Sequence, residues 1–267
     1  MAGVEVGVVV GACLAAILVG LLAGALVNTL ADRVVGVDEP VWSATQCRAC
    51  RAPLPAASPF ALGEFMRRRS CEKCGKHASL RRPLVQTLLP LAFMALVGRV
   101  FLDLQFTSPE FTLPAWEVIG LGTVLFTALA FIFVVDLEHH LIYDLSIWPP
   151  LLLILLCAGL HDIQAVLPLL LGGAISGGLF LLFYGLGWLI YREEALGFGD
   201  VKLAALMGVA VGWSGVMTAL GITIVCGFVT ALLALALDST SRRSFIPFGV
   251  FMVIGAVGVV LTAPIPW

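Results

Sequence analysis

A succession of long apolar segments constrains the fold of this chain more than any other feature of its sequence. The chain is 60% hydrophobic and only 12% charged, and its mean hydropathy is +1.06. A soluble domain, by contrast, is about half apolar and about a quarter charged. The composition therefore excludes an ordinary soluble domain and predicts an all-α polytopic membrane protein.

The apolar segments also predict how the chain is organised. A membrane-spanning helix needs about 20 apolar residues, and the sequence offers about eight candidates, at about 5–31, 84–102, 115–135, 146–160, 164–190, 201–212, 214–237 and 247–263. The two segments that flank Gly212 could merge or break differently. The first segment is too long for a signal-peptide core and lacks a basic flank, so we expect a retained span. The predicted parts are a first helix (1–31), a polar insert (32–83) and a transmembrane domain (84–267).

The distribution of basic residues predicts the orientation. Residues 32–83 hold ten of the fifteen Lys and Arg residues of the chain. Cytoplasmic loops are enriched in Lys and Arg, so we place this insert in the cytoplasm and both termini outside. With eight spans, the loops at 136–145, 191–200 and 238–246 are cytoplasmic too, and fourteen of the fifteen basic residues then lie on that side.

The insert contains two pairs of cysteines with zinc-ligand spacing. Cys47-x2-Cys50 and Cys71-x2-Cys74 are separated by twenty residues. Four thiolates can surround zinc as a tetrahedron, the usual structural arrangement. A redox dithiol pair and unliganded thiols are the alternatives. Because a closed four-sulfur site leaves no open position for chemistry, we expect a structural Zn2+ that stabilises an insert too small for its own core.

A basic cluster in the same insert raises the question of a partner. It consists of Arg67, Arg68, Arg69, Arg81 and Arg82. We interpret it as a contact with the anionic headgroups of membrane lipid in preference to nucleic acid. Small residues at four-residue spacing, which let helices approach closely in membranes, predict helix packing at Gly7 and Gly11, at Gly20 and Gly24, and at Gly173 and Gly177.

Two carboxylates at the ends of apolar segments are the candidate catalytic residues. Asp136 ends the third predicted span and Asp200 begins the sixth, so both lie on the cytoplasmic side. Ionisable residues at membrane depth are costly and mark functional sites. If the two carboxylates approach closely, they share one proton, and one can activate water while the other polarises a scissile carbonyl. The alternatives are membrane-edge residues, with Asp200 capping its helix, and a proton relay in a transporter.

The residues around these carboxylates are candidates for supporting roles. Gly197 and Gly199 precede Asp200, and glycine permits close approach of backbone or of an extended substrate. Asp144 closes the loop after Asp136 and is expected to tune the pair or to hold the loop. We interpret the histidines of that loop, His139 and His140, as solvated residues rather than ligands.

Six stretches of the sequence resemble the type IV prepilin peptidases, which belong to the Gly-x-Gly-Asp class of membrane aspartyl proteases. They are the segment from Gly24 to Asn28 followed by Arg33, the four cysteines, Arg82 to Gln86, Asp136 to Asp144, Gly197 to Leu203 (which contains Lys202), and Ile246 to Gly249. The sequence departs from the family pattern at Gln86, where the family typically has a glutamate, and at Tyr143, where it typically has a proline. No Leu-Pro follows Arg33.

The resemblance implies a specific activity. Asp136 and Asp200 match the two catalytic aspartates, with Gly197, Gly199, Asp144 and Lys202 in support. The implied substrates are prepilins or pseudopilins, cut after the leader at the cytoplasmic face of the bacterial inner membrane. The new N-terminal residue would then be methylated with S-adenosylmethionine, an activity that the family ties to the zinc insert. Gln86 cannot act as a carboxylate, and no nucleotide fingerprint marks the site of the methyl donor.

Two other function classes remain open from the residues alone. A proton-coupled transporter would use Asp136 and Asp200 as a relay and would often show internal repeats. A non-catalytic assembly protein would use the cysteine insert to bind a partner and would leave the two carboxylates far apart.

Overall fold

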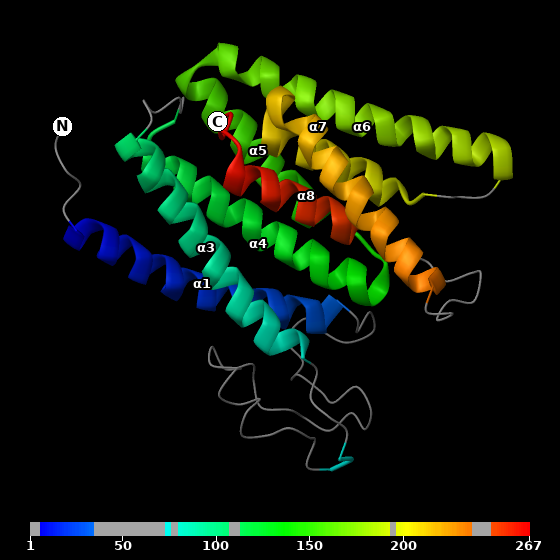
Figure 1. The fold of residues 1–267 in the computed structure, drawn as a ribbon, viewed down its shortest axis with the longest axis horizontal. Helices are drawn as coiled ribbons and strands as arrows, with labels where there is room; N and C mark the ends of the chain where they lie inside the picture. Colours follow the sequence, from blue (N-terminus) through cyan, green and yellow to red (C-terminus); the bar gives the residue numbers. More distant parts are fainter. Residues whose placement is uncertain (1–5, 35–72, 76–79, 107–112, 193–195, 237–246) are drawn as a thin grey trace. The chain divides into compact units, whose positions relative to one another are not determined.

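The computed structural model describes residues 6–34, 73–75, 80–106, 113–192, 196–236 and 247–267. Within these ranges the regular structure is entirely helical (Figure 1). The helices are α1 (Val6–Val34), α3 (Arg81–Phe106), α4 (Ala115–His139), α5 (Asp144–His161), α6 (Ile163–Tyr191), α7 (Phe198–Ala236) and α8 (Phe248–Thr262). The chain divides into two compact units, Met1–Phe106 and Thr107–Trp267.

The helices confirm a multi-pass membrane protein. Six of them, α1 and α3 to α7, are long and apolar enough to cross a bilayer, and α8 is a shorter apolar helix. Seven helices in the described residues cover the expected segments, with 201–212 and 214–237 both falling on α7, and most of the predicted outer boundaries lie within three residues of the observed ends. Most of the cysteine-containing insert (32–83), where zinc was predicted, lies outside the described residues. Of its four cysteines only Cys74 is described, exposed in a short turn.

The first unit is built on the close packing of α1 against α3. A Cβ at Gly20 would overlap the Cα of Pro90, and one at Gly24 would lie 3.2 Å from the Cα of Gln86. This confirms the packing predicted for these two glycines. A Cβ at Gly7 would meet no heavy atom within 4 Å, and the same is true of Gly11, so the packing expected at that pair is not found among the described residues.

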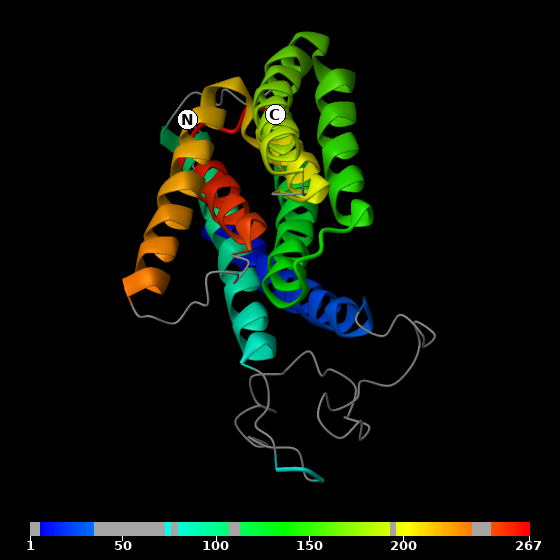
Figure 2. The same ribbon diagram turned by 90° about the vertical axis from the view of Figure 1, so that its right-hand side faces the viewer.

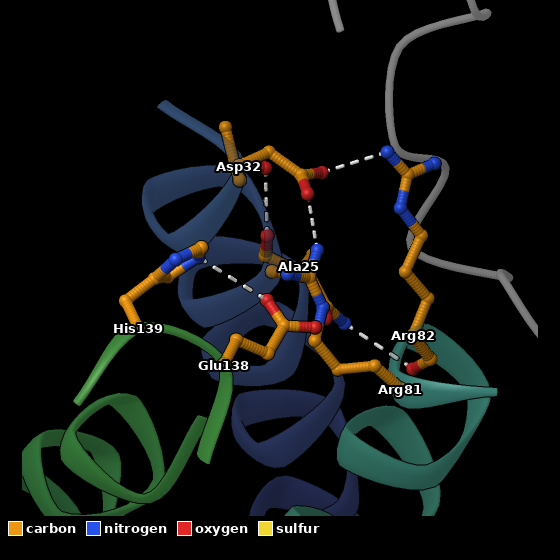
Figure 3. A network of polar contacts seen from close by, with 8 residues as sticks. Ala25, Asp32, Arg81, Arg82, Glu138 and His139 are labelled. Carbon is orange, nitrogen blue, oxygen red and sulfur yellow. Dashed lines mark hydrogen bonds and ion pairs between the residues drawn. The ribbon is translucent and has the colours of Figure 1, made fainter. Parts of the chain in front are cut away.

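The polar end of the first unit is held by ion pairs (Figure 3). The Asp32 carboxylate accepts hydrogen bonds from Arg81, and from Arg82 at 2.7 Å. The amide of Asn28 donates to the backbone carbonyl of Arg82 at 3.2 Å. Arg81 and Arg82, which the sequence interpretation assigned to lipid headgroups, are therefore engaged by Asp32 in joining α1 to α3.

Backbone contact between α6 and α7 organises the second unit. A Cβ at Gly208 would overlap both the carbonyl oxygen of Gly172 and the Ser176 hydroxyl. That hydroxyl lies 2.8 Å from the Gly172 carbonyl of its own helix and 2.7 Å from the Ala204 carbonyl of α7, and its single proton can be donated to either one. The packing predicted at Gly173 is confirmed too, since a Cβ there would lie 2.8 Å from Val209. Such close approach fixes how α7 sits on α6.

A bend at Gly212 divides α7 into two arms. Gly212 has a φ of 62° and a ψ of −176°, which are not helical values, and the positive φ suits glycine. The hydroxyl of Thr223 contacts the sulfur of Met207 at 4.0 Å, although sixteen residues of straight helix would span about 24 Å. The chain therefore doubles back at Gly212, and the two arms of α7 are visible in Figures 1 and 2. This is the break considered at that position in the sequence.

The C-terminal residues cover this bend. Trp267 is fully buried, and its indole N–H donates to the carbonyl of Ala210 at 2.7 Å. A Cβ at Gly212 would lie 2.9 Å from the ring of Pro266. These contacts brace the arm of α7 that carries Asp200.

Candidate active site

One end of the second unit gathers the end of α4 and the starts of α5, α7 and α8. Asp136, in the last turn of α4, accepts a hydrogen bond from Val250 in the first turn of α8. Asp144, the first residue of α5, pairs with Lys202 in the first turns of α7. Segments far apart in sequence therefore meet at this end, and all the predicted site residues of the second unit lie in it.

Asp136 lies buried among apolar helices. It is 4% exposed and is the one acidic residue in the buried core of the described part of the chain. Its Oδ2 accepts from the backbone N–H of Val250 at 3.1 Å, and the backbone of Gly249 hydrogen-bonds the same carboxylate. Four residues later, His140 ends α4 in a left-handed conformation with a φ of 54°, and its N–H donates to the carbonyl of Asp136. The carboxylate is thus held where α4 stops.

Asp200 begins α7 with its side chain turned back toward the glycine loop. Its backbone N–H donates to the carbonyl of Gly197 at 3.0 Å, and the backbone of Gly197 hydrogen-bonds the Asp200 carboxylate in return. This reciprocal contact is a capping arrangement, one of the alternatives considered from the sequence. A Cβ at Gly197 would lie 3.3 Å from Oδ2 of Asp200, so this glycine leaves space beside the carboxylate.

The two carboxylates act on each other. Both lie at one end of the unit: a Cβ at Gly249 would lie 2.7 Å from Oδ2 of Asp136 and 3.3 Å from Leu203, one turn after Asp200, so the charges of the two aspartates can influence each other. Asp200 is partly exposed, whereas Asp136 is buried. Two interacting carboxyl groups can hold one proton between them, which suits general acid and general base roles. The interaction is the opposite of the wide separation expected for a non-catalytic assembly protein.

The loop between α4 and α5 packs on the start of α7. A Cβ at Gly199 would lie 3.0 Å from the Cβ of Ile142, so the absence of a side chain at Gly199 lets this loop approach. Tyr143 packs its ring on Phe131 of α4 with centroids 6.4 Å apart, and its carbonyl accepts from the Ser146 hydroxyl at 2.6 Å. A tyrosine at 143 therefore anchors the loop.

Asp144 and Lys202, two of the predicted supporting residues, form an ion pair. The Lys202 ammonium lies 2.6 Å from Oδ1 of Asp144 and 5.2 Å from the centre of the Phe198 ring. The pair ties the start of α5 to the arm of α7 that carries Asp200. Of the two roles considered for Asp144, holding the loop is the one that this geometry favours.

We expect the Asp144–Lys202 pair to contribute little to stability. The Asp144 side chain is 57% exposed and that of Lys202 is 25% exposed, and such pairs are typically worth about 0–1 kcal/mol. Thermal or denaturant unfolding of Asp144→Asn, Lys202→Met and the double variant gives their coupling energy. We expect a coupling below about 1 kcal/mol that shrinks with added salt. A salt-independent coupling above about 2 kcal/mol would show that the pair is structurally central.

Within the described residues, His139 and His140 do not belong to a group of side chains that could bind a metal ion. His140 is exposed, and its charge interacts with Asp136. His139 lies 3.6 Å from the Glu138 carboxylate (Figure 3). Within the described ranges no group of three or more His, Cys, Asp or Glu side chains could hold a metal ion. The zinc prediction concerns residues that, apart from Cys74, lie outside those ranges.

The sequence interpretation missed the part that α8 plays at this site. It noted Ile246 to Gly249 only as a motif of the last span and gave no residue there a role. In the structure, Gly249 and Val250 contact the Asp136 carboxylate directly. The signal in the sequence was the Pro247-Phe248-Gly249 string at the start of an apolar segment, where a helix begins and its backbone N–H groups are free.

The sequence matches two family descriptions along most of its length. Residues 123–232 match the type IV leader peptidase family, and residues 18–100 match the bacterial peptidase A24 N-terminal domain. The first match contains both Asp136 and Asp200, and the second covers most of α1 and of α3.

Individual relatives agree with these matches. The chain is 29% identical to a type 4 prepilin-like proteins leader peptide-processing enzyme of Escherichia coli O78:H11, over 74% of this chain and 68% of the relative. It is 29% identical to a prepilin leader peptidase/N-methyltransferase of Legionella pneumophila, over 79% and 69%. It is 28% identical to one of Aeromonas hydrophila, over 82% and 73%. No solved structure matches the chain. Matches to this family and to its N-terminal domain, which together span both units, show that the chain belongs to the type IV leader peptidase family.

Proposed function

We propose that this protein is an aspartyl endopeptidase of the membrane that removes the leader peptide of type IV prepilins or pseudopilins and then methylates the new N-terminal residue. The observation that carries the proposal is the pair Asp136 and Asp200, which come from different helices and interact at one end of the second unit. The names of the relatives, prepilin leader peptidase/N-methyltransferase, agree with both activities. The proton-coupled transporter considered from the sequence finds no support among them.

The proposed reaction uses the pair as an acid and a base. One carboxylate takes a proton from a water molecule as the water oxygen attacks the scissile carbonyl carbon. The other carboxyl group gives its proton to the carbonyl oxygen. The tetrahedral intermediate then collapses and the C–N bond breaks. The leaving nitrogen takes the proton that the first carboxylate removed from water, and a hydroxyl proton of the intermediate returns to the second carboxylate. The partly exposed side of Asp200, beside Gly197, is where an extended peptide can approach.

We further propose eight membrane crossings with the active site at the cytoplasmic face of the bacterial inner membrane. The bend at Gly212 supports two crossings for α7, because a straight 39-residue helix would be about 58 Å long. A bilayer core is only about 30 Å thick. The concentration of basic residues in 32–83, together with the site at the end of the second unit that bears Lys202, agrees with the positive-inside rule.

The four cysteines of the insert are proposed to hold a structural zinc ion. Their thiolates are the donor set that zinc prefers in closed sites. One feature of the described turn agrees with this assignment: Gly75 follows Cys74 with a φ of 68°, which produces the tight turn that a Cys-x2-Cys knuckle requires. S-adenosylmethionine would supply the methyl group for the second activity, and we assign none of the described residues to its binding.

Replacing a single cysteine tests the zinc proposal. Cys47→Ser removes one of four thiolates, so we expect the purified protein to lose most of its zinc and the insert to become more sensitive to protease. Metal content is measured by inductively coupled plasma mass spectrometry, with Cys157→Ser, which changes a cysteine in α5, as the matched control. Equal zinc in Cys47→Ser and in the wild type would refute the four-thiolate site.

Mass spectrometry of a reaction product tests the proposed function as a whole. A prepilin is incubated in detergent or liposomes with the purified protein and S-adenosylmethionine. We expect the prepilin to lose the mass of its leader, and the mature chain to gain one methyl group on its N-terminal amine. A product that is cut but unmethylated would limit the function to the peptidase and would point to Gln86. An unchanged prepilin would exclude the proposed function.

A further inference from the structure

The first turn of α8 is built around the Asp136 carboxylate. Pro247 precedes the helix, and Val250 donates its backbone N–H to Oδ2 of Asp136 at 3.1 Å. The backbone of Gly249 adds a second hydrogen bond. The first N–H groups of a helix have no partner within the helix, so the carboxylate satisfies donors that would otherwise be buried without one. Aromatic packing of Phe248 on Phe180 of α6, with centroids 5.6 Å apart, holds this turn in place.

A side chain at position 249 cannot coexist with this contact. A Cβ at Gly249 would lie 2.7 Å from Oδ2 of Asp136 and 3.3 Å from a methyl carbon of Leu203. Contacts under 3.0 Å at a real Cβ essentially never occur. Asp136 itself is 4% exposed and lies in the last turn of α4, so the carboxylate has little room to move aside.

The charged groups near Asp136 do not replace these donors. Within the described residues they include Glu138, His139 and His140 on its own helix, Asp200 on α7, and the Asp144–Lys202 pair, in which each charge has a partner. The range Phe248–Thr262 of α8 contains no ionisable side chain. His140 also acts on the Asp136 charge, but within the described residues the hydrogen bonds to the side-chain carboxylate come from the backbone of α8, and they fix its direction.

We propose that Gly249 is a positioning residue of the peptidase. Because Gly249 has no side chain, the backbone of α8 can hydrogen-bond the Asp136 carboxylate and hold it in the orientation that it needs relative to Asp200. This inference rests on the proposed function, in which Asp136 is one of the catalytic pair. Gly249 does not touch substrate, and its effect passes through Asp136. In this proposal α8, which has no ionisable side chain, helps to set the geometry of the catalytic pair.

The first test compares two glycines of the same helix. Gly249→Ala is expected to lower kcat for prepilin cleavage by about 10- to 100-fold, the range for loss of a hydrogen bond to a charged group, with KM nearly unchanged. Gly258→Ala is the matched control, because its Cβ would make an ordinary contact at 3.6 Å with Ile222, and it should cleave at the wild-type rate. Thermal unfolding in the same detergent shows whether each variant is folded.

A second pair of variants isolates the donor itself. Val250→Pro removes the N–H that reaches Asp136, and proline is tolerated in the first turn of a helix. Val250→Ala trims the same side chain but keeps the N–H. We expect Val250→Pro to be at least about 10-fold slower than Val250→Ala. This comparison stands even if Gly249→Ala fails to fold.

The pH profile separates positioning from a merely structural role. Gly249→Ala and Val250→Pro both take away hydrogen-bond donors that stabilise the ionised Asp136 carboxylate. Asp136 should therefore keep its proton up to a higher pH in these variants. The acidic limb of the kcat profile should therefore move to higher pH in Gly249→Ala and Val250→Pro, and stay in place in Gly258→Ala. Folded Gly249→Ala with wild-type kcat and an unmoved profile would overturn the inference. If the proposed function itself were wrong, the wild-type protein would leave prepilin uncut, so the two failures are distinct.

Discussion

Asp136→Asn and Asp200→Asn are each expected to abolish prepilin cleavage, by roughly 1,000-fold or more, as for residues of other catalytic groups that act as a unit. Neither amide can carry the proton that the reaction moves between water and the scissile bond. The amides are close in size to the carboxylates, and in Asp136→Asn the new amide oxygen can still accept from Val250 as the carboxylate does. We therefore expect both variants to insert and fold normally while cleavage is lost.

A third aspartate provides the matched control for this experiment. Asp162 caps α6 by accepting from the N–H of Gln164 at 2.9 Å, and it lies at the far end of α5 from the catalytic pair. Asparagine caps helices as well as aspartate does, so Asp162→Asn should retain full activity and stability. Cleavage is followed by gel shift of the prepilin, and folding by size-exclusion chromatography and thermal unfolding. Wild-type activity in either Asp136→Asn or Asp200→Asn would falsify the assignment of the pair.

Gly208→Val should have the largest effect on stability. A Cβ at Gly208 would overlap the backbone carbonyl of Gly172 and the Ser176 hydroxyl, and the branched valine adds two more carbons. The Gly172 carbonyl belongs to the backbone and cannot rotate out of the way as a flexible side chain can. To accommodate the valine, α6 and α7 must therefore move apart. Overpacking typically costs about 1–3 kcal/mol, and we expect about 3 kcal/mol or more here. Activity should fall with it, because the same arm of α7 carries Asp200.

The control for that prediction lies on the other arm of α7. A Cβ at Gly221 would meet no heavy atom within 4 Å, so Gly221→Val makes the same chemical change without a clash. We expect Gly221→Val to unfold within about 0.5 kcal/mol of the wild type in the detergent used for Gly208→Val. Equal stability of the two variants would mean that α6 and α7 do not cross at Gly172 and Gly208.

The helices themselves could be predicted from the sequence, because each spanning segment has to be long and apolar whatever it packs against. The position of Asp136 in the last turn of α4 and of Asp200 in the first turn of α7 followed from the same reasoning. The break at Gly212 was visible as a possibility, because glycine permits a positive φ. Local chemistry was sufficient in each of these cases.

Some packing faces could be predicted from glycines, as at Gly20, Gly24 and Gly173. Which helix each face contacts could not, because lipid-facing and buried surfaces are both apolar and periodicity does not distinguish them. The approach of α8 to Asp136 joins residues 114 positions apart, counting from the hydrogen bond to Val250. The pairing of Lys202 with Asp144 spans 58 positions. Arg81 and Arg82 were interpreted as lipid contacts because nothing in the sequence marks Asp32 as their partner. Such pairings depend on the arrangement of whole helices.

The residual cleavage rate of the double variant Asp136→Asn/Asp200→Asn tests the central claim most directly. It is compared with the two single variants under single-turnover conditions, with one prepilin and one batch of membranes. If the two aspartates form one acid/base unit, the double variant will be no slower than either single variant, because removing one member already disables the pair. Single variants that each keep a substantial rate, with losses that multiply in the double variant, would show that the two carboxylates act independently.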